Sequence, residues 1–130
     1  MIQVLLIAAG GALGAVGRYY GAGAFERWLG IAIGPGFPYG TLAVNVIGSG
    51  VLGLLVGLFT ALFESTPEIR FFLVVGLLGG FTTFSAFSLD TVALFEKGEA
   101  GRALLYVMLS VVLSVGALYV ALRLVRWVVS

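Results

Sequence analysis

Long stretches without a charged side chain are the feature that most constrains this chain. They cover residues 1–17, 28–63, 71–89 and 103–122. A helix needs about 20 apolar residues to cross the hydrocarbon core of a bilayer. The second stretch is too long for one crossing and contains the helix-breaking sequence GPGFP, so we divide it into a loop and a helix. The pattern predicts one all-α membrane domain over residues 1–130, with four transmembrane helices at about 2–28, 39–63, 69–97 and 100–128.

The composition excludes several classes of function. Only 13 of 130 side chains are charged and 61% are hydrophobic, too little polarity for the surface of a water-soluble domain. The net charge of +1 provides no basic surface for nucleic acid. The chain has no Cys and no His, so it lacks thiol nucleophiles, imidazole bases and the commonest zinc ligands. We therefore predict a membrane protein that is not an enzyme.

Basic residues divide evenly between the two ends of the predicted bundle. One end has Arg70, Arg123 and Arg126, and the other has Arg27, Lys97 and Arg102, while Arg18 lies inside the first predicted helix. Cytoplasmic loops normally carry a clear excess of Lys and Arg, which sets the orientation of the chain. A balanced chain can insert both ways, which favours an antiparallel, dual-topology homodimer. Chance balance among seven basic residues is the alternative.

The segment GGFTTFSAFSL, residues 79–89, is an unusual filling for a membrane helix. Paired glycines followed by two threonines form a poor helix, so we predict that helix three is broken near its middle. A break frees backbone carbonyls, which suit a hard cation, and it starts a new helix N-terminus, which favours an anion. Phe84 and Phe87 would project from one side of the second half. They either contact lipid and core or present positive ring edges to an anion.

Other polar groups within the spans are also candidate functional residues, because hydrocarbon offers them no water. Asn45 suits either an anion site or a hydrogen bond between helices. Arg18, near the end of the first predicted helix, either reaches the interface or attracts anions to a pore mouth. Tyr106, Ser110 and Ser114 are four residues apart and share a helix face. Their hydroxyls either bond back to their own helix or form a polar track.

Three segments resemble the signature segments of the CrcB/Fluc family of fluoride channels. They are GGALGAVGRY at 10–19, GTLAVNVIGSGVLG at 40–53 and GGFTTFSAFS at 79–88. The length, the four-helix layout and the balanced charge are also similar, so the resemblance covers essentially the whole chain. It implies a channel in the bacterial inner membrane that passively exports fluoride from the cytoplasm and so confers fluoride resistance.

The resemblance also implies an assembly and a set of site residues. The family forms antiparallel homodimers with two pores and a structural sodium ion, which is not transported. The backbone carbonyls of Gly79 and Thr82 match the sodium ligands, and Arg18 matches the vestibule arginine. The residues that match the fluoride pore are Asn45, Phe84, Phe87, Ser85, Tyr106, Ser110 and Ser114.

Two departures from the family pattern stand out, Ala86 and Gly50. Family members usually carry Thr at the position of Ala86, so one hydroxyl of the predicted track is missing here. Many have Phe at the position of Gly50, a change that we expect to affect packing. The rival interpretation is a small dual-topology exporter of drug-like cations. It fits poorly, because such a site needs a carboxylate within the membrane and this chain has its glutamates at the ends of the spans.

Overall fold

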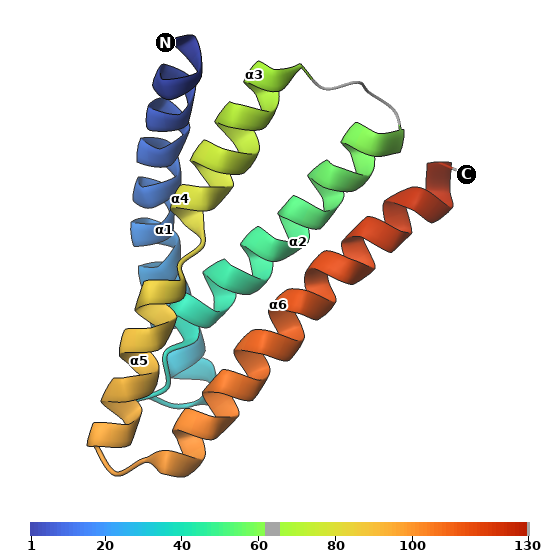
Figure 1. Ribbon diagram of the computed structural model, residues 1–130. Coiled ribbons are helices and arrows are strands. Elements are labelled where there is room, and N and C mark those ends of the chain that lie inside the picture. Colours follow the sequence, from blue (N-terminus) through green and yellow to red (C-terminus); the bar gives the residue numbers. More distant parts are fainter. Residues whose placement is uncertain (62–65, 130) are drawn as a thin grey trace.

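The computed structural model describes residues 1–61 and 66–129, and the regular structure of these residues is entirely helical (Figure 1). Three spans are single helices: α1 (Ile2–Ile33), α2 (Tyr39–Ala61) and α6 (Ala100–Val129). The remaining span, Pro67–Glu96, consists of α3 (Pro67–Arg70), the π-helix η1 (Phe71–Leu78), α4 (Gly79–Phe81) and α5 (Phe84–Glu96). All four are long and apolar enough to cross a membrane, which confirms the predicted all-α membrane protein.

The ends of the helices follow glycine and proline. α1 continues to Ile33, whereas the sequence predicts an end near residue 28, because no strong stop signal precedes Gly34. Gly34 has φ 130°, a backbone conformation that other residues rarely adopt. Gly98, with φ 76°, follows α5, and Pro67 occupies the first turn of α3. The predicted end of the second helix, residue 63, lies outside the described residues.

The helices are arranged as two pairs (Figure 1). α2 and α6 run side by side along their length, and α1 lies along η1 and α4. The pairs diverge toward the end of the molecule that holds both termini. At the opposite end α5 packs against α6, next to the turn that joins them. The extended residues between α4 and α5 therefore lie near the middle of the bundle.

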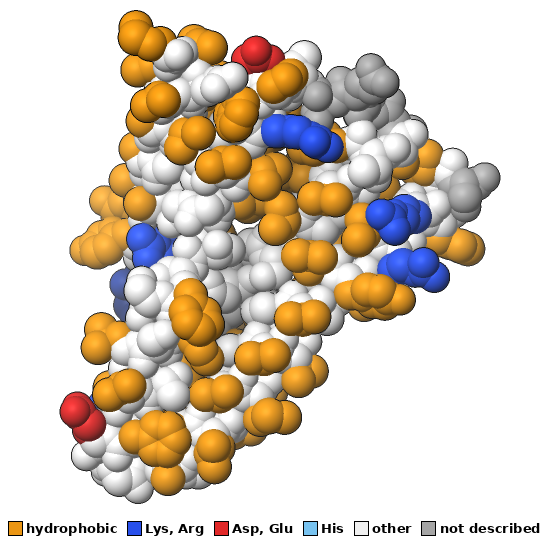
Figure 2. Space-filling model, viewed as in Figure 1, with side chains coloured by type: hydrophobic (Ala, Val, Ile, Leu, Met, Phe, Trp, Pro, Cys, Tyr) orange, Lys and Arg blue, Asp and Glu red, His pale blue; other side chains and the backbone are white. Residues whose placement is uncertain are grey.

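Glycines allow the closest approach between helices, at a seam between α1 and the span beside it. A Cβ atom built on Gly76 would lie 2.9 Å from the carbonyl oxygen of Ile7. A Cβ on Gly14 would lie 2.8 Å from the backbone nitrogen of Phe81. These neighbours are backbone atoms that cannot move aside, so only glycine permits this packing. Large apolar side chains instead face outward, where lipid would surround them (Figure 2).

Candidate functional site

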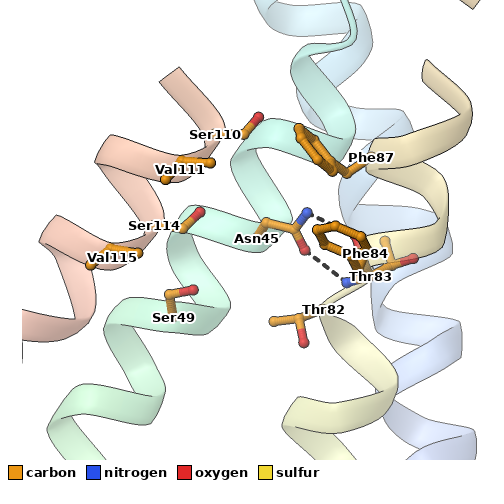
Figure 3. Close-up of a pocket in the computed structure, with 10 residues that line it drawn as sticks. All are labelled: Asn45, Ser49, Thr82, Thr83, Phe84, Phe87, Ser110, Val111, Ser114 and Val115. Atoms are coloured by element: carbon orange, nitrogen blue, oxygen red, sulfur yellow. Dashed lines mark hydrogen bonds between the residues drawn. The ribbon is translucent and has the colours of Figure 1, made fainter. Parts of the chain in front are cut away.

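Two extended residues, Thr82 and Thr83, separate α4 from α5 and form the centre of the candidate site. Their φ and ψ angles are −80° and 156° for Thr82 and −153° and 118° for Thr83. Asn45 of α2 holds this segment with two hydrogen bonds (Figure 3). Its Nδ2 donates to the Thr83 carbonyl at 2.9 Å, and its Oδ1 accepts from the Thr83 N–H at 2.7 Å. Of the two roles considered for Asn45, the structure contains the hydrogen bond between helices.

The side chains of the two threonines satisfy much of the remaining backbone. Thr82 Oγ1 donates to the Leu78 carbonyl at 2.9 Å. Thr83 Oγ1 accepts from the Ala86 N–H at 3.1 Å and thereby caps the N-terminus of α5. The same oxygen lies 3.1 Å from Ser85 Oγ. The predicted pore residue Ser85 therefore interacts with the cap of α5.

The predicted sodium ligands are the backbone carbonyls of Gly79 and Thr82. In a continuous helix the Thr83 N–H would donate to Gly79, but here it donates to Asn45. Thr82 itself lies outside regular helix. Carbonyl oxygen is a suitable ligand for a hard cation, so the chemistry of these groups fits the ion. Within residues 1–61 and 66–129, no group of three or more acidic side chains offers a competing metal site.

A pocket of about 290 Å³ lies beside the extended segment, between α2, α5 and α6 (Figure 3). It brings together five of the predicted pore residues: Asn45, Phe84, Phe87, Ser110 and Ser114. Thr82, Thr83, Ser49, Val111 and Val115 complete the lining. Ser49 was not predicted, although it is one helical turn from Asn45 and so shares its face. We call this cavity the central pocket.

Two hydroxyl groups of the central pocket are unusual. The Oγ atoms of Ser110 and Ser114 are buried, and neither has a hydrogen-bond partner among the described residues. A buried hydroxyl without a partner costs about 1–3 kcal/mol. The alternative that these hydroxyls bond back to their own helix is therefore not what the structure contains. Both remain able to donate to a ligand in the pocket.

An aromatic row leads from the central pocket into the protein core. The ring centres of Phe84 and Phe87 are 5.3 Å apart, and those of Phe87 and Tyr106 are 5.4 Å apart. Phe84 is 79% exposed, whereas Tyr106 is fully buried. The Tyr106 hydroxyl donates to Asp90 Oδ2 at 3.2 Å. Tyr106 therefore does not line the pocket, and it connects the aromatic row to the one aspartate of the chain.

Asp90 also lines a second cavity, of about 250 Å³, near the end of the bundle that holds the 34–38 loop. Glu26, Lys97 and Thr41 contribute to its lining. The Glu26 carboxylate accepts from the Gly40 N–H at 2.8 Å and links α1 to the first turn of α2. The two carboxylates of this cavity thus already accept hydrogen bonds from the protein.

Arg18 lies apart from the central pocket. It lines a separate groove of about 430 Å³, together with Thr41, Thr83 and Ala86. Arg18 is near the midpoint of α1, so the prediction that it lies near the end of that helix is wrong. Ala86 faces the same groove, so a hydroxyl at this position would lie on the Arg18 side of Thr83. Gly50 is different: a Cβ there would lie 3.8 Å from Ala117, an ordinary packing contact.

Comparisons with known proteins agree on a single family. The family model described as "CrcB-like protein, Camphor Resistance (CrcB)" matches residues 5–122. A relative from Rhizobium etli is 49% identical over 97% of this chain and 98% of its own length. One from Rhodospirillum centenum is 48% identical over the full length of both chains, and one from Nitrobacter winogradskyi is 51% identical over 95% of this chain and 94% of its own. All three relatives are named "Fluoride-specific ion channel FluC".

Proposed function

The chain belongs to the CrcB family, and we propose that it is a fluoride-specific channel that passively exports fluoride from the cytoplasm. It is a multi-pass bacterial membrane protein and not an enzyme, since its relatives are named as ion channels. The observation that carries the proposal is the pair of buried hydroxyls, Ser110 and Ser114, that face the central pocket without partners. They offer hydrogen-bond donors in a region that has no bulk water.

The lining of the central pocket suits a small anion that must also leave. Fluoride is a compact hydrogen-bond acceptor, so donors must replace the water that it loses. Ser110 and Ser114 each offer one O–H, and Asn45 has a second N–H beyond the one it gives to Thr83. Phe84 and Phe87 add ring edges, the positive part of the aromatic quadrupole. The described residues that line the pocket include no Lys or Arg, which keeps binding weak enough for release.

The remaining predicted residues would act before and after the central pocket. Arg18, in its separate groove, would raise the anion concentration at the vestibule. Tyr106 would support Phe87 through the contact of their rings. The Ser85 hydroxyl lies next to the Thr83 hydroxyl, so Ser85 would contribute to the fluoride route through Thr83. These roles follow from the resemblance and from the positions of the side chains.

Export follows from the charge of the ion and the membrane potential. Outside the cell, fluoride can take up a proton and cross lipid as a neutral weak acid. Inside, at higher pH, the acid dissociates and the anion is trapped. An inside-negative potential drives an anion outward with about 2.3 kcal/mol per charge per 100 mV. A selective passive pore is therefore sufficient to lower cytoplasmic fluoride.

We propose that the working unit is an antiparallel homodimer with two pores. The even division of basic residues between the two ends supports insertion in both orientations. Between the two helix pairs, Phe59, Phe71 and Val75 help to line an apolar groove of about 550 Å³ that a second copy would cover. The carbonyls of Gly79 and Thr82 from both subunits would supply four oxygens to a central sodium ion. That ion would neutralise the facing carbonyl dipoles and hold the two chains together.

Ion flux from liposomes tests the channel itself. Purified protein is reconstituted with fluoride or chloride inside, and efflux is followed with ion-selective electrodes. We expect fluoride efflux without chloride efflux, and a large loss of flux in the Ser110→Ala/Ser114→Ala variant. Ser88→Ala is the matched control, because the Ser88 hydroxyl bonds back to the Phe84 carbonyl and lies outside the pocket. Absence of fluoride flux from folded wild-type protein would refute the channel, and proton-coupled cation uptake would favour an exporter.

Two further measurements test the assembly and the ion. The chain has no native cysteine, so a single Thr66→Cys variant can be labelled with a membrane-impermeant reagent. Dual topology predicts that half of the copies react from each side of the membrane, whereas labelling from one side alone would exclude it. Replacing sodium by a bulky organic cation should slow fluoride flux or weaken the dimer. Unchanged flux and an unchanged dimer would argue against the sodium site.

A further inference from the structure

The C-terminal part of α6 has a basic and aromatic surface that the proposed channel does not use. We call it the α6 cluster and define it as Tyr119, Arg123, Arg126 and Trp127. With Val120 and Leu124, it lines a groove of about 520 Å³. The Arg123 guanidinium lies 5.9 Å from the centre of the Tyr119 ring, and Trp127 is 78% exposed. Figure 2 shows blue side chains gathered over this end of α6, with no red side chain beside them.

The spacing of two arginines on α6 fits a position of the cluster at the boundary of the membrane. Arg102 and Arg123 are 21 positions apart in the sequence. At about 1.5 Å per residue they are separated by roughly 31 Å along the helix, close to the roughly 30 Å thickness of the hydrocarbon core. If Arg102 lies at one boundary, Arg123 lies at the other. Tyr119 and Trp127 are then one turn to either side of it, where aromatic side chains are enriched.

The charge of the cluster is not compensated by the described part of the protein. At the other end of the bundle, Arg102 lies 3.0 Å from Glu99, and Lys97 shares its cavity with acidic side chains. Arg123 and Arg126 form no ion pair with any acid in residues 1–61 or 66–129. The negative end of the helix dipole amounts to about half a charge, which is less than two guanidinium groups provide. The groove therefore favours an anion.

We propose that the α6 cluster binds the headgroup of an anionic phospholipid. The phosphodiester would accept hydrogen bonds from Arg123 and Arg126, whose planar guanidinium groups match phosphate oxygens. An acyl chain would extend along Val120 and Leu124, which are 54% and 53% exposed on the same surface. Trp127 would lie at the level of the glycerol backbone, with its ring against lipid. The charge of the groove and the exposed apolar side chains of Val120 and Leu124 both fit this ligand.

Tryptophan fluorescence can test the proposal, because the chain has two tryptophans, Trp28 and Trp127. A Trp28→Phe variant leaves Trp127 as the only reporter. It is reconstituted in phosphatidylcholine with increasing fractions of brominated phosphatidylglycerol or brominated phosphatidylcholine, which quench on contact. We expect the anionic lipid to quench several-fold more effectively at equal mole fraction. Each of Arg123→Gln and Arg126→Gln should lower this preference by up to about fivefold, the effect of about 1 kcal/mol per basic side chain.

Two controls separate this site from general attraction of lipid to the protein. Trp127→Phe leaves Trp28, next to Arg27, as the reporter at the opposite boundary, and it should show little preference. Arg27→Gln in the Trp28→Phe background should leave quenching of Trp127 unchanged. Equal quenching of Trp127 by both lipids would overturn the proposal. A preference that survives Arg123→Gln/Arg126→Gln, or that Trp28 shows equally, would also overturn it.

Discussion

Replacing Asn45 by alanine tests whether one side chain holds the extended residues in place. The amide makes two hydrogen bonds to Thr83, at 2.9 Å and 2.7 Å, and Thr83 is only 9% exposed. Alanine would leave the N–H and the carbonyl of Thr83 without these partners. A buried polar group that loses its partner costs about 1–3 kcal/mol, so the two together cost about 2–6 kcal/mol. We expect the free energy of unfolding to fall by this amount and fluoride flux to be lost.

The free energy of unfolding can be measured in mixed micelles by titration with sodium dodecyl sulfate, followed by far-ultraviolet circular dichroism. Ser49→Ala is the matched control, because Ser49 lies one turn further along α2 in the same pocket, whereas the two bonds to Thr83 come from Asn45. We expect this control to change stability by less than about 1 kcal/mol. If Asn45→Ala is no less stable than Ser49→Ala, the two bonds do not hold the segment.

Three further substitutions address the seam, the core and the aromatic row. Gly14→Ala should destabilise the protein by about 1–3 kcal/mol, because the added Cβ would meet the backbone of the neighbouring span. Gly101→Ala is the control, because it has open space around it and should not destabilise the protein. Equal stability of the two variants would refute the seam. Tyr106→Phe keeps the ring contacts but removes the hydrogen bond to Asp90. We therefore expect the free energy of unfolding to fall by about 1–3 kcal/mol in the same titration. An unchanged free energy would show that the bond is not stabilising. Phe87→Ile should lower fluoride efflux about tenfold, because one ring edge is lost. Its stability should change by less than about 1.5 kcal/mol. Efflux at the wild-type rate would argue against contact between fluoride and the ring edge.

The four spans could be predicted because lipid imposes a simple rule of length and polarity on each of them. The uncharged stretches and the GPGFP loop were enough to place the helices to within a few residues. The end of α1 was harder to predict, because nothing in the sequence before Gly34 stops a helix. Arg18 lies near the middle of the helix whether the helix ends at residue 28 or at Ile33, so its predicted position near the end was a separate error.

The candidate site could be predicted in its residue types but not in its pairings. Glycine and threonine at 79–83 predict an interruption, and the backbone of Thr82 and Thr83 is extended. The partner of Asn45 could not be inferred, because residues 45 and 83 meet only through the packing of α2 against the third span. The bond between Tyr106 and Asp90 likewise depends on the turn at Gly98, which sets how α5 lies on α6. The π-helical winding of η1 has no signal in the sequence that we can identify.

The glycine seam between α1 and η1 has a consequence for how the protein is made. Gly10 and Gly76 are in close backbone contact, yet they are 66 positions apart in the sequence. At a synthesis rate of about 5–20 residues per second, α1 waits roughly 3–13 s in the membrane before its partner emerges from the ribosome. Throughout that interval its glycine face is open to any other helix nearby, including the α1 of a second nascent copy. Crosslinking of ribosome-arrested chains in which residue 76 is either still inside the ribosome or already outside it would measure this, and a lack of early α1 contacts would argue that the face is not open.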